Sequence, residues 1–447
     1  MKSRYWSFVG VFFFLCFAEV AIGQFAKGFK TLKYDFGNGK TEKGFTAVTS
    51  SNQYSDATGF GLTCPNGVIT SSQKGKKPAL SSDCVTSAEA FFFVVDVPEG
   101  RYKVTLELGN PNASARTTVK AESRRLMLED IATRPGQIET RTLIIDVRRP
   151  KISEGRSVLL KEREKGSKTW DNNLCLEFNG VNPSVCSVEI ESANELPVIF
   201  LAGNSTVTDQ RMEPWASWGQ TLPRFLKPNI AVANFAESGE TLIGFRKERR
   251  LEKLLSVMKP GDFLFMEFAH NDQKEGSCHV DPYTTYQDEL RFYIAEAKKK
   301  GGIPVLVTST NRRKFDENGN LVNTLDEYPN AMRQLARDEQ VLLIDLIAMS
   351  KSLYEALGVE GSIKAFVHYP INTFPGVNRE LKDDTHFNAY GAYELAKCVV
   401  SKMITMHEFK DFVVDDFGSF NPASPDSADK FFWPLSPLFD AEKPEGN

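Results

Sequence analysis

Four short polar segments carry the residue types that acyl-transfer chemistry requires. Between them they supply a serine, a histidine, an aspartate and several groups able to donate hydrogen bonds to an oxyanion. Three of them follow apolar runs, and the fourth precedes a helical pattern late in the chain. They are Gly203–Thr206, Glu237–Glu240, Ala269–Asp272 and Lys382–Asn388.

The residues of these segments suggest a nucleophile and its base. Ser205 lies in a tight, glycine-assisted turn that would expose its hydroxyl, and His386 could take the hydroxyl proton. Asp383 is three residues before His386, so its carboxylate reaches the imidazole if the segment curls into one turn. The expected oxyanion donors are the backbone N–H groups of Ser205 and Gly239 and the side-chain amide of Asn271.

The elements that position these residues alternate between strands and helices. Short apolar runs predict buried strands at Val198–Ala202, Ile230–Phe235, Phe263–Phe268, Pro304–Thr308 and Val341–Asp345. Helical spacing is found at Lys247–Met258, Tyr283–Lys300 and Asp326–Gln340. This alternation predicts a parallel sheet covered on both faces, where ligands gather at the carboxyl ends of the strands.

The preceding part of the chain, from Gln24 to Asn194, has a different pattern. Its strands are short and rich in β-branched or aromatic residues, and turn signals separate them; examples are Ala90–Val97, Tyr102–Leu108 and Thr142–Val147. No convincing amphipathic helix interrupts them, so we expect an all-β sandwich.

Taken in order, the four polar segments resemble the SGNH (GDSL-type) hydrolases, and within them the rhamnogalacturonan acetylesterases. The family's Gly-Asp-Ser is Gly203–Ser205 here, and its Gly-His-Asn-Asp block is Ala269–Asp272. Its oxyanion-hole glycine falls on Gly239, and its Asp-x-x-His block is Asp383–His386. The resemblance covers about 196–407 and implies a flavodoxin-like three-layer α/β/α fold.

Two positions depart from the family pattern. Asn204 replaces an aspartate that supports the turn, and asparagine can still accept such hydrogen bonds. Ala269 replaces a glycine and adds one methyl group near the pocket. Neither change removes a proton-transfer group, so we expect the activity to survive.

The β-rich half is similar to galactose-binding-like jelly rolls through the segments 34–37, 59–61 and 97–104. We therefore expect a signal peptide at 1–23, a β-sandwich at 24–194, a hydrolase domain at 195–411 and a proline- and aromatic-rich strap at 412–447. The resemblance implies a secreted serine esterase that removes O-acetyl groups from rhamnogalacturonan, a pectic polysaccharide, without a metal or organic cofactor.

Contacts to the sugar are predicted from residue type and position. Trp215 and Trp218 follow the nucleophile segment and could stack on sugar rings, although a core role is equally consistent with their sequence positions. Arg211 and Arg312 could bind a galacturonate carboxylate, since arginine matches a carboxylate with two hydrogen bonds. Ordinary solvated charges remain the alternative for both arginines.

Other functions compete with this interpretation. His270, Asp272, Asp383 and His386 could instead ligate a metal, which would leave the serine and the oxyanion donors unexplained. The substrate could be another acylated glycan such as xylan, or a lipid if an apolar groove adjoins the site. From a different class, the chain could be a carbohydrate-binding protein with an inactive hydrolase half.

Composition and the chain ends restrict location and partners. The 447 residues carry 54 Lys and Arg against 58 Asp and Glu, which argues against nucleic acid as the main partner. Lys2 and Arg4, the short apolar run after them and Ala21–Gly23 are typical of a cleavable secretory signal rather than a membrane span. We expect a secreted or periplasmic monomer.

Export would permit disulfides among the six cysteines that remain after the signal. Closeness in sequence favours the pairs Cys64–Cys84 and Cys175–Cys186. Cys278 and Cys398 are either a third pair or free thiols.

Overall fold

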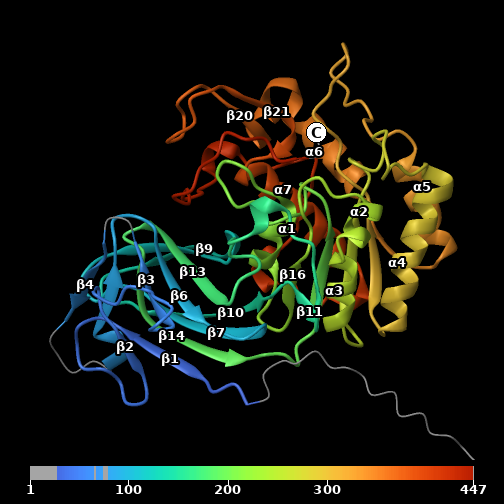
Figure 1. The fold of residues 1–447 in the computed structure, drawn as a ribbon. Coiled ribbons are helices and arrows are strands. Elements are labelled where there is room, and N and C mark those ends of the chain that lie inside the picture. The colour runs from blue at the N-terminus through green and yellow to red at the C-terminus, as the bar shows by residue number, and fades with distance from the viewer. Residues whose placement is uncertain (1–27, 65–66, 74–78, 446–447) are drawn as a thin grey trace, which may run out of the picture.

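The computed structural model describes residues 28–64, 67–73 and 79–445, so the predicted signal peptide at 1–23 lies outside the described residues. Figure 1 shows two halves side by side: a β-rich half built from the first part of the chain, and an α/β half built from the rest. The expected architecture, a β-sandwich followed by an α/β domain with a parallel sheet, is confirmed.

Two sheets form the β-rich half. The first has the order β10 (Glu139–Val147), β7 (Gly100–Leu108), β14 (Ser184–Ser192), β1 (Leu32–Phe36) and β2 (Thr46–Val48), with β5 (Asp83–Thr86) and β4 (Ile69–Ser72) joined through β14. The second has the order β3 (Phe60–Thr63), β6 (Phe91–Asp96), β13 (Asn173–Val181), β8 (Ala115–Ala121) and β9 (Arg125–Thr133). A small hairpin, β11 (Lys151–Ser153) and β12 (Arg156–Ser157), follows β10.

Alternating side chains build the core between these sheets. Along β7, Tyr102, Val104, Leu106 and Leu108 are buried, while the residues between them are partly exposed. They pack in one cluster with apolar residues of the second sheet such as Phe93. A period of two therefore gives each strand one face for the core, as the sequence predicted.

Five parallel strands form the centre of the α/β half. Their order is β16 (Ala231–Asn234), β15 (Val198–Gly203), β17 (Phe263–Glu267), β18 (Ile303–Val307) and β19 (Leu342–Ile344). In chain order this is 2-1-3-4-5, the flavodoxin-like arrangement. The helices are α1 (Trp218–Thr221), α2 (Leu242–Lys247), α3 (Arg250–Val257), α4 (Gln287–Lys299), α5 (Tyr328–Asp338), α6 (Leu346–Gly361) and α7 (Ala389–Met403).

The boundaries of two predicted helices differ from the structure. The segment predicted as Lys247–Met258 is divided, because Arg249 has a left-handed backbone (φ 63°) that separates α2 from α3. The segment Tyr283–Lys300 starts as a π-helical turn, η4 (Pro282–Tyr286), before α4 begins. Asn388 is the N-cap of α7, since its side chain accepts the N–H of Gly391.

Buried arginines join the two halves. Arg125 of β9 lies 3.0 Å from Asp209 in the loop after the candidate nucleophile, and Arg124 lies 2.6 Å from Glu213 in the same loop. Separating such a buried pair would leave an uncompensated charge, which is strongly destabilising, so these contacts fix the loop on the β-rich half. The first half therefore supports the site of the second.

The C-terminal segment returns to the β-rich half, as the red ribbon in Figure 1 shows. Lys120 of β8 donates to the carbonyl of Pro434 and to the hydroxyl of Ser436. Ser436 also bonds to Glu177 of β13 and, through its N–H, to Glu213. The segment thus contacts both halves.

All six cysteines in the described part of the chain are free thiols, so the predicted pairs are not formed. Cys84 and Cys186 interact instead, because the register of β5 on β14 pairs Val85 with Val185 and brings these two cysteines together. Closeness in sequence did not predict which cysteines meet, because β14, the strand that pairs with β5, comes from a distant segment of the chain.

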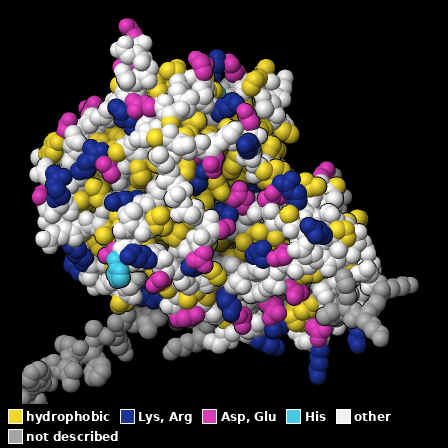
Figure 2. Space-filling model, turned by 180° about the vertical axis from the view of Figure 1, so that it is seen from behind, with side chains coloured by type: hydrophobic (Ala, Val, Ile, Leu, Met, Phe, Trp, Pro, Cys, Tyr) yellow, Lys and Arg dark blue, Asp and Glu magenta, His cyan; other side chains and the backbone are white. Residues whose placement is uncertain are grey.

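Basic and acidic side chains are intermingled on the face drawn in Figure 2, consistent with the formal charge of −4. Among the described residues, none of the helices has the length and apolar character needed to span a bilayer.

Candidate active site

The structure brings Ser205, His386 and Asp383 together in one hydrogen-bonded chain. His386 Nε2 lies 2.9 Å from Ser205 Oγ, and His386 Nδ1 lies 2.7 Å from Asp383 Oδ2. All three side chains are buried. The distances are those of a nucleophile, a base and an orienting acid.

Ser205 owes its position to a tight turn at the carboxyl end of β15. A Cβ on Gly203 would lie 2.9 Å from the Glu267 carbonyl oxygen, so only glycine lets the strand end so close to β17. Asn204 Oδ1 then accepts both the N–H and the hydroxyl of Thr206. This bears out the expectation that asparagine can support the turn.

Asp383 and His386 lie on β21 (Leu381–Phe387), which pairs with β20 (Phe366–Tyr369). The strand bulges there, because Asp383 pairs with Val367 while Phe387 pairs with the adjacent Phe366. Asp383 Oδ1 accepts the N–H groups of Thr385 and His386, which directs Oδ2 at the imidazole. The expected single turn is therefore a β-bulge.

Burial and charge set the protonation states of this pair. Burial lowers the pKa of His386, and the bond to Asp383 only partly opposes that effect. Burial would raise the pKa of Asp383, but its bonds to His386 and to two backbone N–H groups outweigh burial and lower it. At neutral pH the imidazole is therefore neutral and the carboxylate ionised, as a general base and its orienting acid require.

The predicted oxyanion donors come from loops after β15, β16 and β17. Gly239 has a left-handed backbone (φ 82°), which favours glycine. Within the described residues, the backbone N–H groups of Ser205 and Gly239 donate to no protein acceptor. The Asn271 amide gives one hydrogen to the Glu240 carbonyl at 3.0 Å and has a second hydrogen to donate.

Glu267, at the end of β17, supports the nucleophile turn and was missed in the sequence. Its carboxyl accepts the Thr206 hydroxyl at 2.8 Å and the Trp218 indole N–H at 2.5 Å. Burial raises its pKa to about 7. A lone acidic residue at the end of an apolar strand, immediately before Ala269–Asp272, was the signal that could have identified it.

The predicted sugar contacts divide into two groups. Trp215 packs edge-on against His386, with ring centroids 5.8 Å apart. Trp215 and Arg211 both line a cavity of about 730 Å³. Trp218 is fully buried and bonded to Glu267, so the sugar-stacking hypothesis does not fit and the core role does. Arg312 donates to the carbonyls of Thr324 and His270, which makes it a support of the loop after β17.

The proposed metal cluster is not assembled. His270 bonds to the Thr310 carbonyl, and Asp272 accepts the N–H of Leu242. Across the described residues, no group of three or more His, Cys, Asp or Glu side chains is arranged to hold a metal ion.

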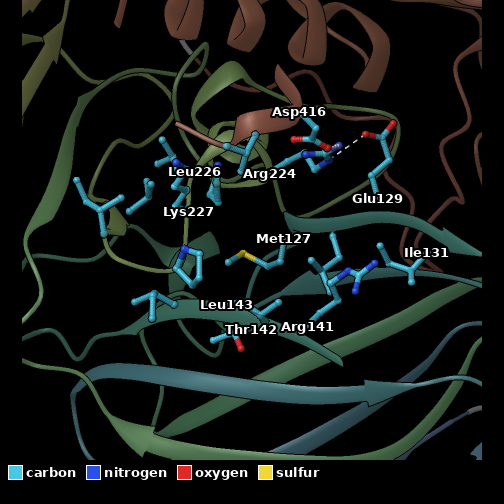
Figure 3. A pocket seen from close by; sticks show the side chains of 17 residues that line it. Met127, Glu129, Ile131, Arg141, Thr142, Leu143, Arg224, Leu226, Lys227 and Asp416 are labelled. Carbon is cyan, nitrogen blue, oxygen red and sulfur yellow. Dashed lines mark hydrogen bonds and ion pairs between the residues drawn. The ribbon is translucent and has the colours of Figure 1, made fainter. Parts of the chain in front are cut away.

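A separate cavity of about 350 Å³ lies between the two halves (Figure 3), and its lining includes none of the residues of the Ser205 site. It is lined by β9, β10 and the segment after α1, and Arg224 crosses it to pair with Glu129. Its lining residues include no serine, cysteine or histidine, so it lacks the serine and histidine that the Ser205 site combines.

Comparison with known proteins agrees with this geometry. Residues 201–392 match the GDSL-like Lipase/Acylhydrolase family. The chain is 42% identical to the rhamnogalacturonan acetylesterase RhgT of Bacillus subtilis over 203 residues, which is 45% of this chain and 87% of RhgT. The chain belongs to the GDSL-type acylhydrolases. It is accordingly a carboxylic ester hydrolase.

The N-terminal half has its own match. Residues 32–140 match the galactose-binding domain-like part of the beta-agarase/YXIM esterase-like proteins. The esterase YxiM of Bacillus subtilis is 26% identical over 401 residues, covering 87% of this acylhydrolase and 94% of YxiM. The solved structure of YxiM covers 84% of this chain and 98% of its own, with 25% identity and a TM-score of 0.43.

Proposed function

We propose that this acylhydrolase is a secreted serine esterase that removes O-acetyl groups from rhamnogalacturonan. The observation that carries the proposal is the Ser205–His386–Asp383 chain, with distances of 2.9 and 2.7 Å. The 42% identity to a rhamnogalacturonan acetylesterase supports the choice of glycan. Export rests on the sequence of residues 1–23.

The proposed reaction has two steps. His386 Nε2 takes the proton of Ser205, whose Oγ attacks the acetyl carbonyl, and the N–H groups of Ser205 and Gly239 and the amide of Asn271 stabilise the oxyanion. The imidazolium returns the proton to the sugar oxygen as the alcohol leaves. Water, activated by the same imidazole, then attacks the acetyl-enzyme, releases acetate and restores Ser205.

Acetate release from a panel of acetylated glycans tests the proposal. The wild-type enzyme should release acetate fastest from acetylated rhamnogalacturonan fragments, and Ser205→Ala should release none while retaining its unfolding temperature. Faster release of acetate from acetylated xylan would show that xylan, and not rhamnogalacturonan, is the preferred substrate. Hydrolysis of none of the glycans, and of no p-nitrophenyl acetate, would instead favour a binding protein without catalysis.

A further inference from the structure

The end of the chain lies against the candidate active site. Asp440 and the residues 442–445 line a cavity of about 730 Å³ together with Arg163, Arg211 and Trp215. Lys443 Nζ is 3.6 Å from Asp383 Oδ1, and the Trp215 indole donates to the Asp440 carbonyl. Residues 440–445, here called the tail, therefore lie beside the catalytic residues, in space that a substrate would enter.

Among the described residues of the β-rich half, Arg163 is the arginine that lines this cavity. Arg163 lies in η2 (Glu162–Glu164), a short turn between β12 and β13. Its Nε is 2.9 Å from Glu237 Oε1, and its Nη2 donates to the Ser238 carbonyl at 2.6 Å. These two bonds hold the guanidinium beside the loop that carries Gly239.

The third nitrogen of Arg163 binds a carboxylate of the tail. Nη1 lies 2.6 Å from Glu445 Oε2, and Arg163 is the main cause of the lowered pKa of Glu445. The same carboxylate oxygen lies 3.4 Å from the point where a Cβ on Gly239 would stand. A carboxylate is thus held next to a predicted oxyanion donor.

The Glu445 side chain is 65% exposed, whereas its partner Arg163 is held by the protein on its other two nitrogens. An exposed ion pair is weak, so an external carboxylate can displace Glu445 at small cost. Lys161 lies beside the same position, bonded to the Ser238 carbonyl at 2.8 Å and paired with Glu240 at 2.6 Å, and it contributes to the lowered pKa of Glu445. Nη1 is the nitrogen of Arg163 that Glu237 and Ser238 do not engage, and a charge-assisted hydrogen bond from it to a carboxylate is stronger than a neutral one.

We propose that Arg163, with Lys161 beside it, binds the carboxylate of a uronic acid residue in the substrate, and that Glu445 occupies this position in the free enzyme. The inference rests on the proposed function and names the charged group by which the glycan is recognised. It makes Arg163 a specificity-determining residue and places part of the substrate site on the β-rich half.

The first test compares one acetylated oligosaccharide in two forms, with its uronic acid carboxylates free or methyl-esterified. In Arg163→Gln, the ratio of kcat/KM for the free acid to that for the methyl ester should fall about tenfold, mainly through KM, because a charge-assisted hydrogen bond is lost. Arg163→Lys should retain part of the preference. Arg156→Gln is the matched control, because it breaks a surface pair with Glu252 near the same segment and should leave the ratio unchanged.

The second test uses Glu445→Gln and measures inhibition of p-nitrophenyl acetate hydrolysis by unacetylated trigalacturonate. Removing the competing carboxylate should lower the inhibition constant up to about fivefold, the range expected for an exposed ion pair. Methyl-esterified trigalacturonate should inhibit more weakly than the free acid in both proteins.

The inference is overturned if Arg163→Gln keeps the wild-type ratio, or if the free acid and the methyl ester inhibit equally. Failure of the proposed function looks different: p-nitrophenyl acetate is hydrolysed, but no pectic fragment releases acetate. In that case the inhibition experiment alone decides whether a uronic acid carboxylate binds at the position that Glu445 occupies.

Discussion

Replacing Asp383 with asparagine should inactivate the enzyme while changing only one functional group. Asp383 Oδ1 accepts two backbone N–H groups, so an asparagine would keep its carbonyl oxygen there and turn its NH2 toward His386 Nδ1. Nδ1 would then have to accept a hydrogen bond, which puts the ring proton on Nε2. An imidazole protonated at Nε2 cannot take the proton of Ser205.

The expected loss in kcat is about 10³- to 10⁴-fold, the effect of a wrong histidine tautomer in a serine triad. Water should not restore the lost interaction, because the two side chains are only 2% and 1% exposed. Turnover of p-nitrophenyl acetate and thermal unfolding would be measured for the wild type and for Asp383→Asn. Asp384→Asn is the matched control, since the side chain of Asp384 is 51% exposed and pairs with Arg313 and His368. A loss below tenfold in Asp383→Asn, or an equal loss in Asp384→Asn, would refute the reasoning.

Three further predictions concern the surroundings of the triad. Asn271→Ala should lower kcat about 10²- to 10³-fold with little change in KM, because the amide would act on the oxyanion rather than on the ground state; an unchanged kcat would remove it from the oxyanion hole. Since burial lowers the pKa of His386 from 6.5, the midpoint of the acid-side loss of kcat/KM, where the imidazole gains a proton, should lie below pH 6.5; a midpoint at or above pH 6.5 would contradict this. The pKa of Glu267 is raised from 4.5 to about 7, so the folded state binds its proton more tightly than the unfolded state, and the resulting stability is lost as pH rises from 4.5 through 7. We therefore expect the unfolding free energy of Glu267→Gln, measured relative to the wild type in urea titrations, to be about 3 kcal/mol higher at pH 8 than at pH 4.5. If this difference between the two proteins is the same at both pH values, Glu267 is ionised throughout.

Local patterns were sufficient to predict the fold class. Alternation along β7 and the apolar runs of β15 and β17 carry their periodicity in the sequence, and each run became a strand within one or two residues of its expected ends. The helix boundaries could not be predicted as well from the sequence, because the division between α2 and α3 depends on the left-handed backbone of Arg249.

Ser205, Gly239 and Asn271 could be located because each follows a strand at the same edge of the sheet, whereas Asp383 and His386 on β21 could be located only from their residue types and spacing. The residues around them could not be predicted, since Arg163 comes from the β-rich half and Glu445 from the C-terminal segment. Trp218 shows the opposite limitation: its position suggested a sugar contact, and only the packing around Glu267 shows that it belongs to the core. The cysteine pairs failed for the same reason, because strand order decides which residues meet.

Labelling with a fluorophosphonate tests the central claim, the nucleophilic Ser205, most directly. The probe bonds covalently to an activated serine hydroxyl, and peptide mass spectrometry identifies the residue. We expect one probe per chain, on Ser205, and no labelling in His386→Ala, because the imidazole 2.9 Å away activates the hydroxyl. Labelling of a different serine, or equal labelling of Ser205 without His386, would contradict the account.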